Sequence, residues 1–212
     1  SAMGHAITIN GILRCDPIKI DDGPQKEYSC SGTPVDCVKL AVNEILERRP
    51  DLVVSGINHG SNSSVNVLYS GTMSAAMEGC LEGIPSIGFS LCDFSWQANF
   101  EEALPFIKRI CESVLEKGLS AKTVLNVNIP QFKGEAYKGI KVCRQANGNW
   151  EEEFDRREDP RSRNYFWLTG KFVDYDKGTD EWALANNYIS MVPMTSDLTA
   201  HHLIGSMKNW EL

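Results

Sequence analysis

The sequence of 212 residues lacks any apolar stretch that approaches the ~20 residues needed for a membrane-spanning helix. It also lacks internal repeats and low-complexity tracts, which argues against a solenoid or a disordered tail. Its content of 42% hydrophobic and 23% charged residues is typical of a folded globular protein. We therefore predict a soluble protein with no membrane partner.

Positive charge is scarce, because 28 acidic residues outnumber 21 Lys and Arg and leave a net charge of -7. Proteins that bind nucleic acid polymers or anionic membranes need a basic surface, so neither is expected as a partner. Small phosphorylated ligands stay compatible with this charge. Backbone amides and one metal ion can bind an anion locally on an acidic protein.

Paired cysteine motifs are absent as well. The seven cysteines form no C-x-x-C pair, and several lie within apolar runs. An odd number of cysteines in such a setting favours buried free thiols over a disulfide framework and predicts a cytoplasmic protein. They are Cys15, Cys30, Cys37, Cys80, Cys92, Cys111 and Cys143.

Strand and helix patterns alternate between residues 31 and 89, which is typical of an α/β fold with a mostly parallel sheet flanked by helices. Thr33 and Pro34 predict the start of a first helix, because one is a favoured N-cap and the other a favoured first helical residue. The branched apolar run 51–56 predicts a buried parallel strand. Further elements are predicted at 72–79 (helix), 85–90 (strand), 100–117 (helix) and 124–129 (strand).

The pattern changes beyond Gly139. Residues 144–163 are polar and highly charged, whereas 165–168 and 188–192 alternate like exposed-edge strands or hairpins. Such strands would leave exposed edges in a monomer, so we expect them to pack on a neighbouring subunit. The predicted domains are a catalytic core at 1–139 and an extension with hairpin strands and a terminal helix at 140–212.

Asn58 and His59 follow the predicted strand at 51–56, at the edge where open α/β sheets bind ligands. The Asn58 amide oxygen suits Mg²⁺, Mn²⁺ or Ca²⁺, but the same side chain commonly closes an Asx-turn. His59 has the chemistry of a general acid or a metal ligand, and it equally fits an ordinary surface residue. The local sequence leaves both alternatives open.

Ser70, Gly71 and Thr72 precede a helix rich in small residues. Two hydroxyls and several unpaired N–H groups at a helix start form an anion site, although the same residues are found as plain N-caps. The small-residue loop 1–5 leads into an alternating segment, 6–9, that predicts a strand. The acidic pair at 21–22 is interpreted as turn chemistry rather than as a metal site.

Taken together, the motifs resemble one family. The chain contains S-A-M-G-H, then S-G-T-P-V-D-C-V-K-L, D-L-V-V-S-G-I-N-H-G, Y-S-G-T-M-S-A-A-M-E-G and I-P-S-I-G-F-S. This order and spacing resembles the SurE (survival protein E) family of 5'-nucleotidases, from Ser1 to about Pro130 and more loosely beyond. The resemblance implies a Rossmann-like sheet with a C-terminal hairpin extension used in oligomerisation.

The resemblance also implies an activity, which is hydrolysis of nucleoside 5'-monophosphates by a homodimer or homotetramer with one divalent metal ion (Mg, Mn or Ca). Activity on 3'-nucleotides and short polyphosphate would also fit. Ser1 and Asn58 match the metal ligands of the family motifs, and Ser70, Gly71 and Thr72 match the S-G-T turn toward the phosphate, with a catalytic as well as a binding role. Gly4 and His5, in the small-residue loop, are further candidates for phosphate or nucleotide binding. His59 is a further catalytic candidate, and His5 and His59 are both hypotheses for the general base because they lie in the two flanking loops.

The resemblance implies one more element, a strand ending in N-D-D-G, whose two aspartates would hold the metal. We expect the protein to carry that strand ahead of Ser1. The rival interpretation is a non-catalytic nucleotide-binding module, or an inactive fragment of the same fold. A serine or cysteine hydrolase fits poorly, because the sequence has no G-x-S-x-G motif and no Cys with a positioned His.

Overall fold

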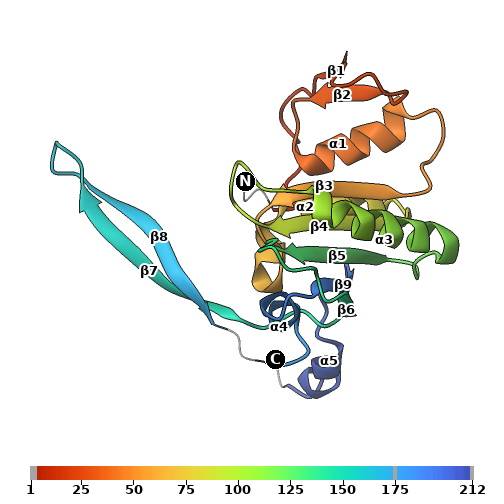
Figure 1. Ribbon diagram of the computed structural model, residues 1–212. Coiled ribbons are helices and arrows are strands. Elements are labelled where there is room, and N and C mark those ends of the chain that lie inside the picture. The colour runs from red at the N-terminus through yellow and green to blue at the C-terminus, as the bar shows by residue number, and fades with distance from the viewer. Residues whose placement is uncertain (1–3, 174–175, 211–212) are drawn as a thin grey trace.

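The computed structural model describes residues 4–173 and 176–210 and contains a central five-stranded sheet in the order β3-β4-β5-β9-β6 (Figure 1). The first three strands are parallel, β9 is antiparallel to β5, and β6 is parallel to β9. The predicted α/β class with a mostly parallel sheet is therefore confirmed. The strands are β3 (Val53–His59), β4 (Ser86–Cys92), β5 (Thr123–Pro130), β6 (Ile140–Val142) and β9 (Ile189–Thr195).

Strands β4 and β5 form the centre of the core because both of their faces are covered. Ile87 and Phe89 in β4, and Val127 in β5, are fully buried, and each such side chain contributes about 1.5–3 kcal/mol to stability. One face packs against Ile110 and Val114 of α3 (Leu104–Lys117), a helix that the short 3-10 turn Glu101–Ala103 precedes. Continuous apolar runs are expected for strands buried in this way.

Helix α2 (Gly71–Leu81) covers the other face, where Met73, Ala76 and Cys80 pack on Val124. Its small residues allow a close approach to the sheet. A Cβ atom added to Gly79 would lie 2.5 Å from the Oγ atom of Ser86, so that position has no room for a side chain. The helix begins one residue before the predicted Thr72.

Helix α1 (Pro34–Leu40) begins as predicted, with Thr33 as its N-cap, and continues as a π-helical turn over Ala41–Ile45. Thr33 and Asp36 form a capping box, in which each side chain accepts a hydrogen bond from the other's backbone N–H. Asp36 also accepts hydrogen bonds from Thr8, at 3.0 Å from its backbone N and 2.6 Å from its Oγ1. This buried carboxylate therefore ties the N-terminal segment to the helix.

The strand predicted at 6–9 is wrong, because these residues have no strand neighbour. The N–H of Thr8 is satisfied by the Asp36 carboxylate, a side-chain acceptor that alternation of apolar residues does not reveal. A small hairpin follows instead, formed by β1 (Cys15–Ile18) and β2 (Glu27–Cys30). The acidic pair 21–22 lies in the turn between these strands, as predicted.

Asp36 makes the stability of this region sensitive to acid. Burial acts to raise the pKa of Asp36, but the hydrogen bonds from Thr8 and Thr33 outweigh it and hold the pKa at about 2. A carboxyl whose pKa is lower in the folded than in the unfolded chain stabilises the fold above its unfolded pKa, near 4, and this stabilisation is lost as the pH falls toward about 2.

We therefore expect the free energy of unfolding to fall more steeply between pH 5 and 2.5 in the wild type than in Asp36→Asn. Urea denaturation of both proteins across this range measures the difference. Equal slopes would show that Asp36 has no depressed pKa. Asp51→Asn, at an exposed carboxyl paired with Arg48, is the matched control.

A long hairpin of β7 (Asn149–Glu158) and β8 (Asn164–Val173) projects away from the sheet (Figure 1). It exposes Phe154 and four consecutive apolar side chains at 165–168, with exposed fractions from 42% to 64%. Segment 165–168 thus lies in a hairpin, as predicted. Its use in oligomerisation stays a prediction.

Segment 188–192 does not form the predicted exposed-edge strand. It belongs largely to β9, which lies between β5 and β6, with Ile189 and Ser190 fully buried. Alternation identified the strand but not its neighbours. The boundary predicted at residue 139 stays a prediction, although the central sheet extends across it. The remaining helices are the 3-10 helix Ser64–Tyr69, α4 (Asp180–Ala185) and α5 (His201–Met207). Within the described residues no helix is long and apolar enough to cross a membrane.

Candidate active site

Among the predicted site residues that the structure describes, Asn58 and His59 end strand β3 at the carboxyl edge of the parallel strands. The strand that carries Asn58 extends to His59, three residues further than predicted, with a register shift against β4 between Ser55 and Asn58. Gly56 makes this path possible: its φ is +110°, and an added Cβ would lie 2.3 Å from the carbonyl oxygen of Phe89. The shift places Asn58 beside the end of the neighbouring strand.

The Asn58 side chain uses only its amide nitrogen within the described structure. Nδ2 donates to the carbonyl oxygens of His59 and Gly60, both at 3.0 Å. Its Oδ1 atom accepts no hydrogen bond from any described residue. The side chain therefore closes its own loop and still presents a neutral oxygen, so the two alternatives left open by the sequence are compatible.

Metal binding can be tested against these contacts. The open Asn58 oxygen suits a hard divalent cation. However, the described residues contain no cluster of three or more His, Cys, Asp or Glu side chains that could hold a metal. The second predicted ligand, Ser1, lies outside the described residues. The described part of the chain thus supplies one fitting ligand, not a complete metal site.

The start of α2 is arranged as an anion site would be. Ser70 is the N-cap: its Oγ accepts from the N–H of Met73 at 3.0 Å, and its carbonyl accepts from Ser74. The N–H groups of Gly71 and Thr72 are not bonded to any described residue, as expected for the first turn of a helix. Ser70 therefore acts as an N-cap, as one of the two alternatives required. The N–H groups of Gly71 and Thr72 beside it bond to no described residue and can still bind an anion.

The N-terminal loop lies against the same helix start. The N–H of Gly4 donates to the carbonyl of Tyr69 at 3.0 Å. The next residue, His5, places Nε2 2.9 Å from Oε2 of Glu78 on α2. Glu78 is 5% exposed and also accepts from Lys39 at 2.7 Å. The structure therefore brings Gly4 to the predicted Ser70–Thr72 turn, whereas the side chain of His5 lies further along α2, at Glu78.

Glu78 fixes the ring of His5 through its charge. Burial acts to raise the pKa of Glu78, but hydrogen bonds from Lys39 and His5 outweigh it and keep the pKa below its ordinary value. An ionised Glu78 can only accept hydrogen bonds, so His5 donates through Nε2. By contrast, the exposed ring of His59 makes no hydrogen bond with described residues and packs edge-on against Phe100, with 4.9 Å between ring centroids.

A buried polar network supports this edge and was not predicted from the sequence. Asn62 accepts from Asn126 through its carbonyl, donates to Asn128 through its N–H, and donates to Ser90 through Nδ2. Asn126 and Asn128 are linked at 3.0 Å, and all four side chains are at most 6% exposed. The sequence does contain a signal for this network. Asn126 and Asn128 lie within the apolar run of β5, and buried polar side chains need hydrogen-bond partners.

The same edge offers no cysteine nucleophile. Cys92, the last residue of β4, lies beside Ser61 of the loop, and burial raises the pKa of its thiol to about 12. Such a thiol stays protonated at neutral pH, and a thiol is a far weaker nucleophile than a thiolate. This agrees with the absence of a hydrolase motif built on Cys.

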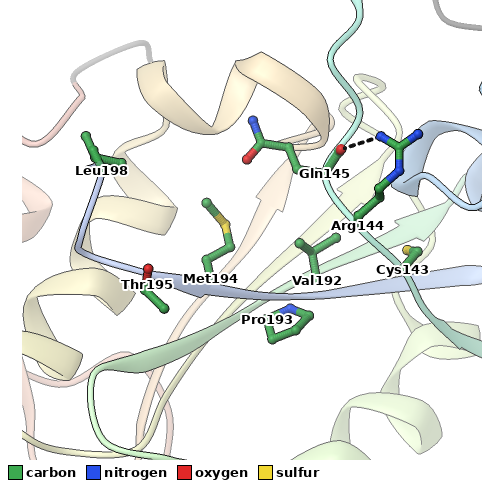
Figure 2. Close-up of a pocket in the computed structure, with 8 residues that line it drawn as sticks. All are labelled: Cys143, Arg144, Gln145, Val192, Pro193, Met194, Thr195 and Leu198. Atoms are coloured by element: carbon green, nitrogen blue, oxygen red, sulfur yellow. Dashed lines mark hydrogen bonds between the residues drawn. The ribbon is translucent and has the colours of Figure 1, made fainter. Parts of the chain in front are cut away.

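Two pockets in the described structure contain none of the predicted site residues. One, of about 390 Å³, is lined by residues of β9 and the segment 143–145, including Met194 and Arg144 (Figure 2). The other, of about 370 Å³, lies between the ends of β4 and β5 and helix α4. We place the candidate site at the open edge instead, because Oδ1 of Asn58 and the first amides of α2, which bond to no described residue, are there.

Comparison with known proteins identifies the family. Residues 1–152 match the family model described as survival protein SurE. The chain is 62% identical over 214 residues to a protein named 5'-nucleotidase SurE from Flavobacterium psychrophilum, and 49% identical over 218 residues to one from Bacteroides fragilis. Both matches cover 100% of this chain and 83% of the relative.

A solved structure agrees with the sequence matches. The SurE protein from Aquifex aeolicus superposes with a TM-score of 0.83 at 40% identity, covering 97% of this chain and 82% of that one. The family resemblance stated from the motifs is therefore confirmed along the whole chain. On its family match, its relatives and its fold, this chain belongs to the SurE family.

Proposed function

We propose that this chain is a phosphatase that hydrolyses nucleoside 5'-monophosphates to nucleoside and phosphate, and that 3'-nucleotides and short polyphosphate are further substrates. The observation that carries the proposal is its 62% identity to a 5'-nucleotidase SurE over the full length of the chain. The open oxygen of Asn58 and the free amides of Gly71 and Thr72 support it. An amide oxygen binds a cation, whereas backbone N–H groups bind an anion. A phosphate ester with its metal counter-ion needs both kinds of group.

In this proposal the N–H groups of Gly71 and Thr72 bind the phosphoryl oxygens, and Gly4 and His5 close the phosphate site from the other side. A divalent cation of the Mg, Mn or Ca type, held by Asn58 and Ser1, would neutralise charge on the phosphate oxygens. Ser70 acts through its cap, which fixes the direction of the first amides of α2. The hydrogen bond from Nε2 of His5 to Glu78 fixes the orientation of the imidazole ring.

The proposed assembly is a homodimer or homotetramer in the cytoplasm. The exposed apolar side chains of the β7–β8 hairpin support the assembly, since exposed apolar clusters mark interaction surfaces. Light scattering of the purified protein measures the assembly directly.

Phosphate release is the direct test of the activity. Purified protein is incubated with adenosine 5'-monophosphate and Mn²⁺ or Mg²⁺, with and without excess chelator, and phosphate is measured. We expect release that the chelator abolishes and added metal restores. Nucleotide binding without release would favour the rival, a non-catalytic nucleotide-binding module or inactive fragment of this fold.

The two histidines are expected to differ in their effects. His59 is exposed, and its ring nitrogens make no hydrogen bond with described residues, so they can take part in proton transfer. We expect His59→Asn to lower kcat by about 100-fold with little change in KM. His5 is fixed on Glu78, and its neighbour Gly4 contacts the segment just before the phosphate amides, so His5→Asn is expected mainly to raise KM by displacing this loop. Unchanged turnover in His59→Asn would remove this residue from the mechanism. His202→Asn, on the exposed α5, is the control.

A further inference from the structure

The loop of residues 93–100, termed the aromatic loop, follows β4 at the carboxyl edge of the sheet. It presents two large apolar side chains to solvent: Phe94 is 82% exposed and Trp96 is 99% exposed. Trp96 has the largest exposed fraction among the exposed apolar side chains of the described residues. An exposed fraction of 99% means that packing within the described residues does not explain the position of the Trp96 ring.

The aromatic loop lies directly beside the residues of the candidate active site. The ring of Phe94 rests on the backbone of Gly60, because a Cβ atom added there would lie 2.3 Å from Cε1 of Phe94. Phe100 contacts the ring of His59, and the N–H of Gly60 donates to Leu91 at 2.8 Å. Gly60 is two residues from Asn58, so the aromatic surface continues from the loop that carries the proposed metal ligand.

Hydrogen bonds within the aromatic loop hold its shape. Asp93 accepts from the N–H of Ser95 at 2.8 Å, and Ser95 accepts from Gln97 at 3.1 Å and from Ala98 at 3.2 Å. A loop already ordered in this way loses little conformational entropy when a ligand binds. Trp96 is therefore presented to solvent, and Phe94 keeps most of its ring exposed while one edge contacts Gly60.

We propose that the aromatic loop is the nucleobase-binding element of this enzyme, with Phe94 and Trp96 stacking on the base of the nucleotide whose phosphate lies between Asn58 and α2. This inference rests on the proposed function and adds residues that determine specificity. Stacking on aromatic side chains tolerates every base, because each base has a π-face. The loop thus selects nucleotides over phosphate esters without a base, and discriminates weakly among bases.

The test compares two substrates that differ in the base. For wild type, Phe94→Ala and Trp96→Ala, kcat/KM is measured with adenosine 5'-monophosphate and with ribose 5-phosphate. We expect each variant to lose roughly 5- to 100-fold with the nucleotide and to be unchanged with ribose 5-phosphate. Trp96→Phe, which keeps an aromatic face, should recover most of the loss. Equal effects on both substrates, or no effect on either, would overturn the proposal.

Two controls show whether a loss of activity has a cause other than base stacking. Trp210→Ala removes an exposed tryptophan near α5 and should alter neither substrate. Light scattering then shows whether Trp96→Ala has the mass of the wild-type assembly. A reduced mass together with equal losses on both substrates would mean that a second copy of the chain covers Trp96, which contradicts base stacking.

A binding measurement keeps this inference separate from the proposed activity. Adenosine, which has a base but no phosphate, is titrated into wild type and Trp96→Ala by calorimetry. Weaker binding to the variant supports the base site even if neither protein releases phosphate, in which case only the proposed function fails. Equal affinity for adenosine in both proteins would overturn the base site whatever the activity.

Discussion

Asn58→Ala is expected to reduce metal-dependent phosphate release by at least about 100-fold. The substitution removes Oδ1, which accepts no hydrogen bond from the described residues and is the proposed ligand for a divalent cation. It also removes two hydrogen bonds from Nδ2 to the loop, so part of the loss comes from a less ordered loop. Phosphate release measured across a Mn²⁺ titration reports the effect.

A second variant separates the two roles of Asn58. Asn58→Asp keeps an oxygen for the cation and loses the Nδ2 donors, so it should need no more metal than the wild type but turn over more slowly. Asn43→Ala is the matched control, because Asn43 is an exposed asparagine whose Nδ2 donates to the carbonyl of Lys39 on α1. If Asn58→Ala and Asn43→Ala have the same activity, Asn58 is not a ligand.

The fold was predictable where burial on both faces imposes a local pattern. Strands β4 and β5 and the helices that cover them have apolar runs or helical spacing, and all were identified. The N-cap of α1 was predictable for a similar reason, because Thr33 and Pro34 act on their immediate neighbours. The local sequence pattern does not indicate which strands are neighbours or which distant side chains bond to each other. The neighbours of β9 and the side-chain partner of Thr8 depend on segments far away in the sequence.

The same distinction applies to the site. Asn58 and Ser70 could be named as candidates from the sequence, because each lies in a segment with a local conformational pattern, whereas Gly4 was named only with the help of the family resemblance. The pairing of His5 with Glu78 joins residues 73 positions apart, and no local pattern indicates it. The network of Asn62 and Asn128 spans 66 positions and depends on which loop covers the end of β5.

Asp180→Ala is expected to destabilise the fold more than Asp36→Asn does at neutral pH. Asp180 is fully buried at the start of α4 and accepts three backbone hydrogen bonds. Oδ2 accepts from Ser64 at 2.8 Å, and Oδ1 accepts from Ala146 and from Glu181, both at 2.9 Å. One carboxylate thereby joins the loop after β3, the segment after β6 and helix α4.

Removing the carboxylate leaves these N–H groups without their acceptor, and Ser64 and Ala146 are themselves fully buried. Each buried donor without a partner costs about 1–3 kcal/mol, so the free energy of unfolding should fall by roughly 3–5 kcal/mol. For a chain of this length, that corresponds to a decrease in Tm on the order of 10 °C. Urea denaturation and calorimetry measure the two quantities.

Graded variants show whether the three hydrogen bonds are the cause. Asp180→Asn keeps one acceptor oxygen and should lose about half as much as Asp180→Ala. Asp51→Ala removes an exposed carboxylate paired with Arg48 and should leave stability nearly unchanged, because exposed ion pairs contribute little. A loss in Asp180→Ala no greater than in Asp51→Ala would contradict the assignment. The Asn62 network would then contribute more than Asp180 to holding the site loop, and Asn128→Leu would be the more damaging substitution.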